Sequence, residues 1–247
     1  MVASIQDNDV KMAVFCEYSL TGYRTDLYCI SDLVPGVSSD GLEKIAKKHD
    51  MWLSGGTVEK VGDKIANVSL MISPTKGLVA KYRKIHPFGQ AERDNIVFGD
   101  EPIVVDTDLG KVGMTICYDF LFPELVRGLV LQGAEIILNS AFWFADGPAG
   151  FAPEQIISLA RTRALENNVY VAMASRKGEE KALWGDKLRG FGYSSIVSHT
   201  GQTLAIAGLG EVVITAPIDL STRAEWSEYA PHINDRRPEL YKKLLDI

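Results

Sequence analysis

Cysteine is scarce in this 247-residue chain, and basic charge is not in excess. The three cysteines, Cys16, Cys29 and Cys117, cannot all pair, and no Cys-x-x-Cys or Cys/His cluster predicts a zinc site. Free thiols suit a reducing compartment, so we expect a cytoplasmic protein, and we expect no metal and no cofactor. The formal net charge of −6 gives nucleic-acid binding no electrostatic support.

Long hydrophobic runs are also lacking. No apolar segment approaches the roughly 18 to 20 residues of a membrane span, so we expect no membrane partner. The N-terminal residues lack the basic and apolar regions of a signal peptide. The contents of 46% apolar and 23% charged residues are ordinary for a globular protein with a sizeable core. Without repeats, low-complexity segments or linkers, residues 1–247 are predicted to form a single domain.

The segment from Lys111 to Trp143 has the pattern of a strand, a turn, a helix and a second strand. Residues 112–116 predict a buried strand, Pro123 and Glu124 suit the first turn of a helix, and residues 135–139 predict the next parallel strand. Cys117 would then lie at the carboxyl end of a strand, where α/β sheets bind ligands and where the pKa of a thiol is lowered. The alternative is a buried core cysteine.

Hydrophobic periodicity predicts an α/β fold for the rest of the chain. Helices are expected at 40–49 and 153–167 and in the tail from 221, and loops at 19–39, 86–100 and 144–153. Strands are expected at 10–16, 52–58, 66–72, 78–84, 103–105, 169–174, 191–197, 203–207 and 211–217, and the three between 52 and 84 as an antiparallel meander.

Three reactive groups end predicted strands: Glu17, Lys84 and Cys117, with Glu92 eight residues after Lys84. A thiol, a carboxylate and an ammonium together suit covalent catalysis at a carbonyl carbon, in which the thiol attacks, the carboxylate carries protons and the ammonium stabilises the oxyanion. Lys84 would also favour the thiolate of Cys117. Each residue alone is usually just a solvated strand end, so the joint arrangement carries the hypothesis.

Three segments of the sequence resemble the signatures of the nitrilase superfamily of carbon–nitrogen hydrolases: FCEYSLTGY, KYRKIHPFG and ICYDFLFPELVRGLVLQGAEII. The resemblance implies a four-layer αββα sandwich. It implies Glu17 as general base and acid, Lys84 and the backbone N–H of Tyr118 as oxyanion donors, and Cys117 as the nucleophile that forms a thioester. Glu92 matches the family's second glutamate, which supports Lys84 and positions the substrate.

The sequence departs from the family pattern at two places. Cys16 stands where the family usually has a proline before the catalytic glutamate, which puts a second thiol near the site. The family's first helix, expected between about 7 and 9, is missing: Asp7 to Asp9 are too few for the crossover of about a dozen residues that neighbouring parallel strands need. Either Met1–Gln6 is not the usual first strand, or a segment is absent from this sequence.

The resemblance favours a small carboxylic amide as substrate, cleaved to acid and ammonia, with a nitrile or an N-carbamoyl amino acid as alternatives. Phe142 and Trp143 would favour small aliphatic or aromatic amides, or would instead pack in the core or a dimer interface. Arg176 and Lys177 would bind a substrate carboxylate or lie at the surface. The substrate-binding candidates are Tyr23, His86, Asn139, Phe142 and Trp143.

Two further alternatives stay open. His86 would share a strand face with Lys84, so a Cys–His pair with His86 as base is conceivable, although Glu17 matches the family residue for residue. The chain could also be a catalytically silent interaction protein or a redox-sensing protein, against which the intact set of Glu17, Lys84, Glu92 and Cys117 argues. The family commonly forms homodimers or higher homo-oligomers, here through the helices at 124–131 and 153–167 and the C-terminal tail.

Overall fold

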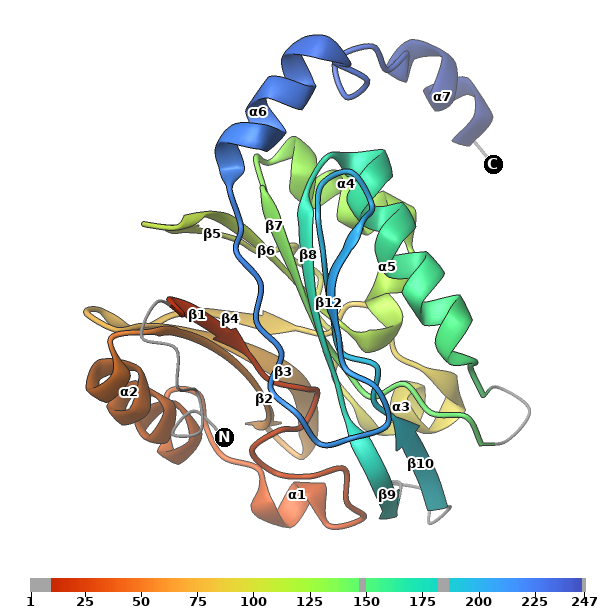
Figure 1. Cartoon of the computed structure of the whole chain (residues 1–247). Coiled ribbons are helices and arrows are strands. Elements are labelled where there is room, and N and C mark those ends of the chain that lie inside the picture. Colours follow the sequence, from red (N-terminus) through yellow and green to blue (C-terminus); the bar gives the residue numbers. More distant parts are fainter. Residues whose placement is uncertain (1–9, 147–149, 182–186, 246–247) are drawn as a thin grey trace.

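Two β-sheets face each other in the computed structural model, which describes residues 10–146, 150–181 and 187–245 (Figure 1). Sheet A has the order β1-β2-β3-β4 and consists of β1 (Met12–Val14), β2 (Trp52–Val61), β3 (Lys64–Ser73) and β4 (Gly77–Arg83). Sheet B has the order β12-β11-β8-β7-β6-β5 and consists of β5 (Val104–Thr107), β6 (Gly110–Ile116), β7 (Ile136–Ala141), β8 (Tyr170–Ser175), β11 (Ser195–Val197) and β12 (Thr203–Ile206). A separate hairpin pairs β9 (Lys177–Lys181) with β10 (Lys187–Phe191).

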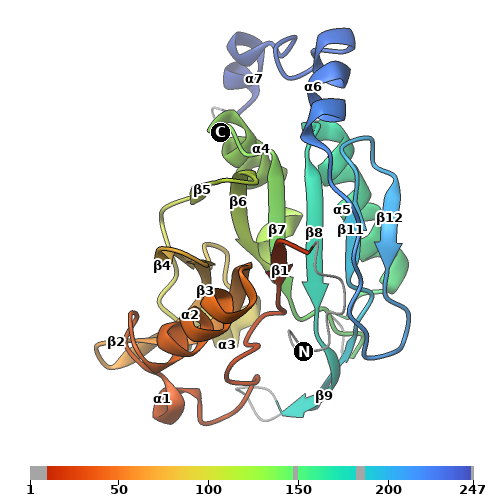
Figure 2. The same ribbon diagram turned by 60° about the vertical axis from the view of Figure 1, so that its left-hand side comes forward.

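Helices flank the two sheets and extend beyond them near the C-terminus (Figure 2). They are α1 (Leu27–Ile30), α2 (Val37–His49), α3 (Gly89–Asn95), α4 (Pro123–Leu131), α5 (Pro153–Asn167), α6 (Leu220–Tyr229) and α7 (Pro238–Leu245), with a 3₁₀ turn η2 at Cys117–Leu121. α2 packs on sheet A, and α4 and α5 pack on sheet B. The order through the molecule is therefore helix, sheet, sheet, helix, and the α/β class expected from the sequence is confirmed.

Apolar side chains fill the spaces between these layers because each sheet is apolar on both faces. Between α2 and sheet A, Leu42 and Ala46 of the helix contact Leu53 and Leu70. The larger cluster holds sheet B against sheet A and against α4 and α5, and it includes Met71, Met114, Leu138 and Ile156. β7 is buried along its whole length and starts with the apolar run 136–138, as suits a parallel strand between two layers.

Strand direction gathers the chain's reactive residues at one place. β1 runs parallel to β2, β3 antiparallel to β2, and β4 antiparallel to β3, so β1 and β4 end at the same edge of sheet A. β6, β7 and β8 are mutually parallel, so residues 117, 142 and 176 follow strands that end at one edge of sheet B. This edge is where open α/β sheets place their ligands.

Several predicted elements need correction. Residues 211–217 form no strand, and the predicted strand 191–197 is interrupted because Gly192 and Tyr193 have φ of +78° and +59°. The predicted loops 19–39 and 86–100 contain α1, the start of α2, and α3. The parallel pair β6–β7 and the antiparallel meander β2–β3–β4 are confirmed.

Two predictions about chain organisation are not tested. The missing crossover after Met1–Gln6 lies outside the described residues, and the single domain 1–247 stays a prediction. None of the helices in the described ranges is both long and apolar enough to cross a membrane.

Candidate active site

Cys117 begins the η2 turn immediately after β6 and is almost completely buried. Its φ of +46° is a left-handed conformation, which costs free energy in a residue with a side chain and is common at functional sites. Asn139 steadies this turn, because its Nδ2 donates to Thr115 Oγ1 at 3.0 Å and to the Cys117 carbonyl at 3.5 Å. Cys117 Sγ lies 3.7 Å from the carbonyl oxygen of Phe142.

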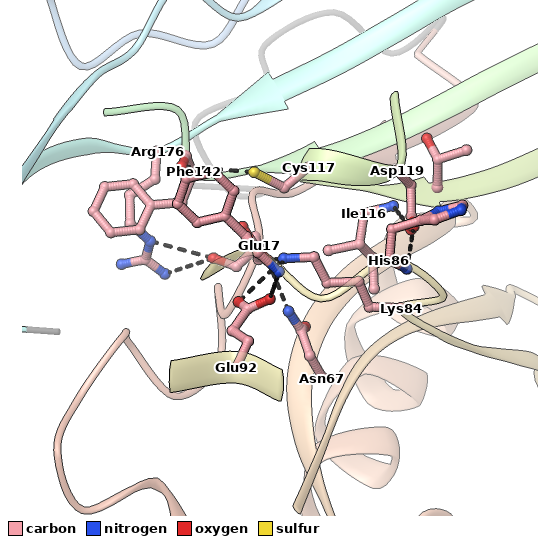
Figure 3. Close-up of polar contacts among 12 residues, drawn as sticks. Glu17, Asn67, Lys84, His86, Glu92, Ile116, Cys117, Asp119, Phe142 and Arg176 are labelled. Atoms are coloured by element: carbon pink, nitrogen blue, oxygen red, sulfur yellow. Dashed lines mark hydrogen bonds and ion pairs between the residues drawn. The ribbon is translucent and has the colours of Figure 1, made fainter. Parts of the chain in front are cut away.

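Lys84 lies at the centre of a buried charge cluster (Figure 3). Its Nζ donates to Glu17 Oε1 at 3.0 Å and to Glu92 Oε1 and Oε2 at 3.1 and 3.0 Å. Asn67 Nδ2 donates to the same Glu17 oxygen at 2.7 Å, and the backbone N–H of Phe88 donates to Glu92 at 2.6 Å. Every charge therefore has hydrogen-bonded partners, as buried charges require.

The protonation of this cluster follows from burial and from its neighbours. Burial lowers the pKa of Lys84, but Glu17 and Glu92 raise it by more, so the pKa lies well above its ordinary value. Burial raises the pKa of Glu92; Lys84 opposes that rise and Glu17 adds to it. Lys84 is therefore a fixed cation, suited to stabilise a developing oxyanion.

The expected lowering of the Cys117 pKa is wrong. Burial raises the pKa of the thiol well above its ordinary value, Glu17 raises it further, and Lys84 only partly opposes them. The helix that follows offers little help because α4 starts only at Pro123, after the η2 turn. The resting group is a neutral thiol, so it needs a base to take its proton during attack.

Asp119, which the sequence analysis did not single out, anchors the nucleophile turn. It is completely buried and accepts from the backbone N–H of Ile116 at 3.0 Å and of His86 at 2.8 Å. It also accepts from Tyr82 Oη at 2.6 Å and lies 2.9 Å from His86 Nδ1. The only signal in the sequence was its position two residues after Cys117 in a tight turn.

One cavity joins the reactive residues, with an empty volume of about 320 Å³ that includes some open solvent. It is lined by Glu17, Tyr18, Tyr23, Lys84, Phe88, Glu92, Cys117, Phe142, Trp143, Phe144 and Phe151. Of the five substrate-binding candidates, Tyr23, Phe142 and Trp143 line it. His86 instead stacks on Phe122 with centroids 3.6 Å apart, and Asn139 supports the Cys117 turn from behind.

Arg176 is another residue whose place the sequence left open. Its guanidinium donates to the Glu17 carbonyl at 3.1 and 3.2 Å and to the Tyr18 carbonyl at 2.6 Å, and it pairs with Glu180 of β9. Its side chain is largely buried, so it is not a surface charge. Lys177, in contrast, is exposed. Arg176 holds the backbone at Glu17 in place.

Neither of the other two thiols lines the cavity. Cys29 is exposed, and Cys16 is half-buried, with a pKa that burial raises and Arg176 partly lowers. Within the described ranges no group of three or more His, Cys, Asp or Glu side chains is arranged to hold a metal ion. The arrangement offers a buried thiol, two carboxylates and a fixed ammonium around one small cavity.

Known proteins share this fold and sequence pattern. The model of the carbon-nitrogen hydrolase family matches residues 1–228. The chain is 37% identical over 221 residues to omega-amidase NIT2-B of Xenopus laevis, covering 85% of this chain and 77% of that protein.

Two solved structures have the same fold. A carbon-nitrogen hydrolase from Helicobacter pylori G27 matches with a TM-score of 0.85 at 25% identity, covering 96% of this chain and 86% of that one. Saccharomyces cerevisiae Nit3, a member of branch 10 of the nitrilase superfamily, matches with a TM-score of 0.80 at 30% identity, covering 93% and 84%. This chain thus belongs to the carbon–nitrogen hydrolase family as an amidase-like member of the nitrilase superfamily.

Proposed function

We propose that this enzyme hydrolyses a small carboxylic amide to the acid and ammonia through a thioester on Cys117. The observation that carries the proposal is the Lys84 ammonium, held 3.0 Å from Glu17 and bordering the same cavity as the Cys117 thiol. These are the base, the oxyanion donor and the nucleophile that acyl transfer needs.

In the first half-reaction, Glu17 takes the proton of the Cys117 thiol as the sulfur attacks the amide carbon. The carbonyl oxygen becomes an oxyanion, which Lys84 and the backbone N–H of Tyr118 stabilise. Collapse of this intermediate breaks the C–N bond, and Glu17 returns its proton to the departing nitrogen. Ammonia leaves, and the acyl group stays on sulfur as a thioester.

In the second half-reaction, water attacks the thioester carbon and Glu17 takes a proton from it. The second tetrahedral intermediate uses the same oxyanion donors. Its collapse breaks the C–S bond, the Cys117 sulfur regains a proton, and the acid leaves. Glu92 keeps Lys84 in place throughout, because both of its carboxylate oxygens lie within 3.1 Å of Nζ.

The test is ammonia release from small aliphatic amides by the wild type and by Cys117→Ala. We expect ammonia from the wild type. In the variant, kcat should fall by at least about 1,000-fold, because the remaining residues of a catalytic set contribute little once the nucleophile is removed. Cys29→Ala is the matched control, because Cys29 is exposed and lies in α1. It should retain wild-type activity.

Other outcomes would redirect or overturn the proposal. Ammonia and acid from nitriles but not from amides would make the enzyme a nitrilase. Carbon dioxide appearing with ammonia from N-carbamoyl amino acids would make it a carbamoylase. Equal ammonia release by wild type and Cys117→Ala would overturn the thioester route.

We also propose that the enzyme forms a homodimer through α4 and α5. Leu131 at the end of α4 and Leu165 in α5 are about half exposed, and the half-buried Phe151 and Leu159 line a groove beside α5. A second copy would cover these apolar groups. The molar mass in solution, from light scattering after size exclusion, should be twice that of the chain, and a monomer would contradict the proposal.

A further inference from the structure

We propose that the cavity selects amides whose acyl group is uncharged and rejects those that carry a carboxylate, with Glu180 as a determinant of that selection. This proposal rests on the proposed amidase function. It names the acyl group that the site takes. The argument comes from the charges that surround the cavity.

The described lining of the cavity has no unpaired cation for a substrate carboxylate. Lys84 is the only Lys or Arg among its described lining residues, and its ammonium already contacts both Glu17 and Glu92. Two carboxylates thus face one ammonium. A bound carboxylate would need a partner, because burying an anion without one is strongly unfavourable.

Arg176 contacts the backbone of two cavity residues, and its hydrogen-bonding groups are already paired. Its N–H groups reach the carbonyls of Glu17 and Tyr18, and Glu180 neutralises its charge. Glu180 also accepts from the backbone N–H of Tyr23, a residue of the cavity wall. Both Glu180 oxygens are therefore occupied, and the Arg176 guanidinium is held by Glu180 and by backbone carbonyls, so it is not free to pair with a ligand carboxylate.

Other basic residues near this edge do not change the balance. Lys177, Lys181 and Lys187 of the β9–β10 hairpin are exposed, and Arg189 pairs with Asp146 at the surface. The segments 1–9, 147–149, 182–186 and 246–247 contain no Lys or Arg in the sequence. Arg93, which follows Glu92 in α3, is exposed and does not line the cavity. Among the described lining residues, no guanidinium is thus available to a substrate carboxylate.

The aromatic wall of the cavity, formed in part by Tyr18, Tyr23 and Phe142, lies in the electrostatic field of the Glu17 and Glu92 carboxylates. The pKa of Tyr18 and of Tyr23 is raised well above its ordinary value by burial, and Glu92 and Glu17 raise it further, although Lys84 partly opposes the rise at Tyr23. The wall is otherwise apolar, with Tyr23 stacked on Tyr18 at 4.8 Å between centroids and edge-on to Phe142 at 5.6 Å. Such a wall favours neutral, apolar acyl chains.

The test compares three amides of equal chain length: valeramide, 4-nitrobutanamide and glutaramate. The last two replace the terminal methyl group of valeramide with a neutral nitro group or with a carboxylate of nearly the same shape. We expect kcat/KM for glutaramate to be at least about 100-fold below that for either neutral amide, since like charges in close contact repel each other. The nitro compound separates charge from size.

Glu180→Gln should narrow the gap between glutaramate and 4-nitrobutanamide about tenfold, because Arg176 loses its anionic partner. Glu179→Gln is the matched control. Glu179 precedes Glu180 in β9 and is exposed. Its substitution should leave the ratio of kcat/KM between glutaramate and 4-nitrobutanamide unchanged.

The ratio of kcat/KM between glutaramate and the neutral amides in the wild type decides the proposal, even if Glu180→Gln fails to fold. Glutaramate hydrolysed as fast as valeramide would overturn the selection while leaving the amidase function intact. An unchanged ratio in a folded Glu180→Gln would overturn the assignment of Glu180. No ammonia from any of the three amides, nor from shorter ones, would overturn the proposed function and this inference together.

Discussion

Asp119 and His86 are joined twice, although they lie on different sides of the interface between the sheets. Asp119 Oδ1 accepts from the His86 backbone N–H at 2.8 Å and lies 2.9 Å from His86 Nδ1. Because Asp119 belongs to the turn that begins with Cys117, and His86 follows Lys84 by two residues, this contact ties the nucleophile to its cation. Asp119 is a positioning residue for the reaction.

Asp119→Asn should lower kcat about 10- to 100-fold with little change in KM, and should lower the free energy of unfolding by about 3 kcal/mol. Both carboxylate oxygens accept hydrogen bonds, from the Ile116 N–H, the Tyr82 hydroxyl and the His86 N–H. In asparagine one oxygen is replaced by an NH₂ group, which cannot accept, so at least one of these donors loses its partner. Steady-state kinetics and urea denaturation measure both effects. Asp63→Asn, in the exposed β2–β3 turn, is the control and should change neither.

Gly56→Ala should lower kcat/KM by at least about tenfold and destabilise the fold by about 1 to 3 kcal/mol. A Cβ at Gly56 would lie 2.6 Å from the Tyr18 nitrogen, 2.9 Å from the Cys16 oxygen and 3.1 Å from Glu17 Cα, so the catalytic carboxylate must shift. In Gly41→Ala the new Cβ meets nothing within 4 Å, and helix α2 should gain about 0.5 to 1 kcal/mol. Wild-type activity in Gly56→Ala would show that the backbone at Glu17 tolerates displacement.

Tyr18→Phe should raise the melting temperature by a few degrees while lowering kcat/KM. The Tyr18 hydroxyl is buried, borders the cavity and has no hydrogen-bond partner in the described part of the chain, which costs about 1 to 3 kcal/mol. A bound amide would supply that partner, so activity falls when the hydroxyl is removed. Tyr82→Phe is the contrast: its hydroxyl donates to Asp119, so its removal should lower the melting temperature.

The stability of the wild type should fall faster above about pH 9 than that of Cys117→Ala. The pKa of Cys117 is raised in the folded state above its ordinary 9.0, mainly by burial, so the unfolded chain loses this proton first. The contribution is fully present below pH 9 and is lost as pH rises toward the folded-state pKa. Urea denaturation of both proteins between pH 7 and 10.5 tests it; parallel curves would mean an unperturbed thiol.

The features that could be predicted from the sequence are those that depend on neighbouring residues in the chain, such as the strands and the residues that follow them. Apolar runs such as 112–116 predicted strands correctly, because strands of a sheet that is covered on both faces are mostly apolar. The strand ends at Glu17, Lys84 and Cys117 followed from those strands. The strand predicted at 211–217 shows the limit: its β-branched residues fit a strand, but Val212 and Val213 are exposed and pair with nothing in the described structure.

The supporting contacts could not be predicted because they join residues far apart in the chain. Arg176 lies 159 positions from the Glu17 carbonyl that it binds, and Asn67 lies 50 positions from the Glu17 carboxylate. The β9 strand, Lys-Gly-Glu-Glu-Lys, has no apolar alternation and exists through its pairing with β10. The direction of the Cys117 pKa shift depends mainly on how deeply the thiol is buried. The position of a cysteine in a sequence motif does not predict that burial.

The site is divided between the two sheets: sheet A carries Glu17 and Lys84, and sheet B carries Cys117. A chain in which each sheet has formed but the two have not docked would hold every reactive group and still be inert. Return of catalysis during refolding would therefore time the docking event itself, separately from the earlier appearance of secondary structure in circular dichroism.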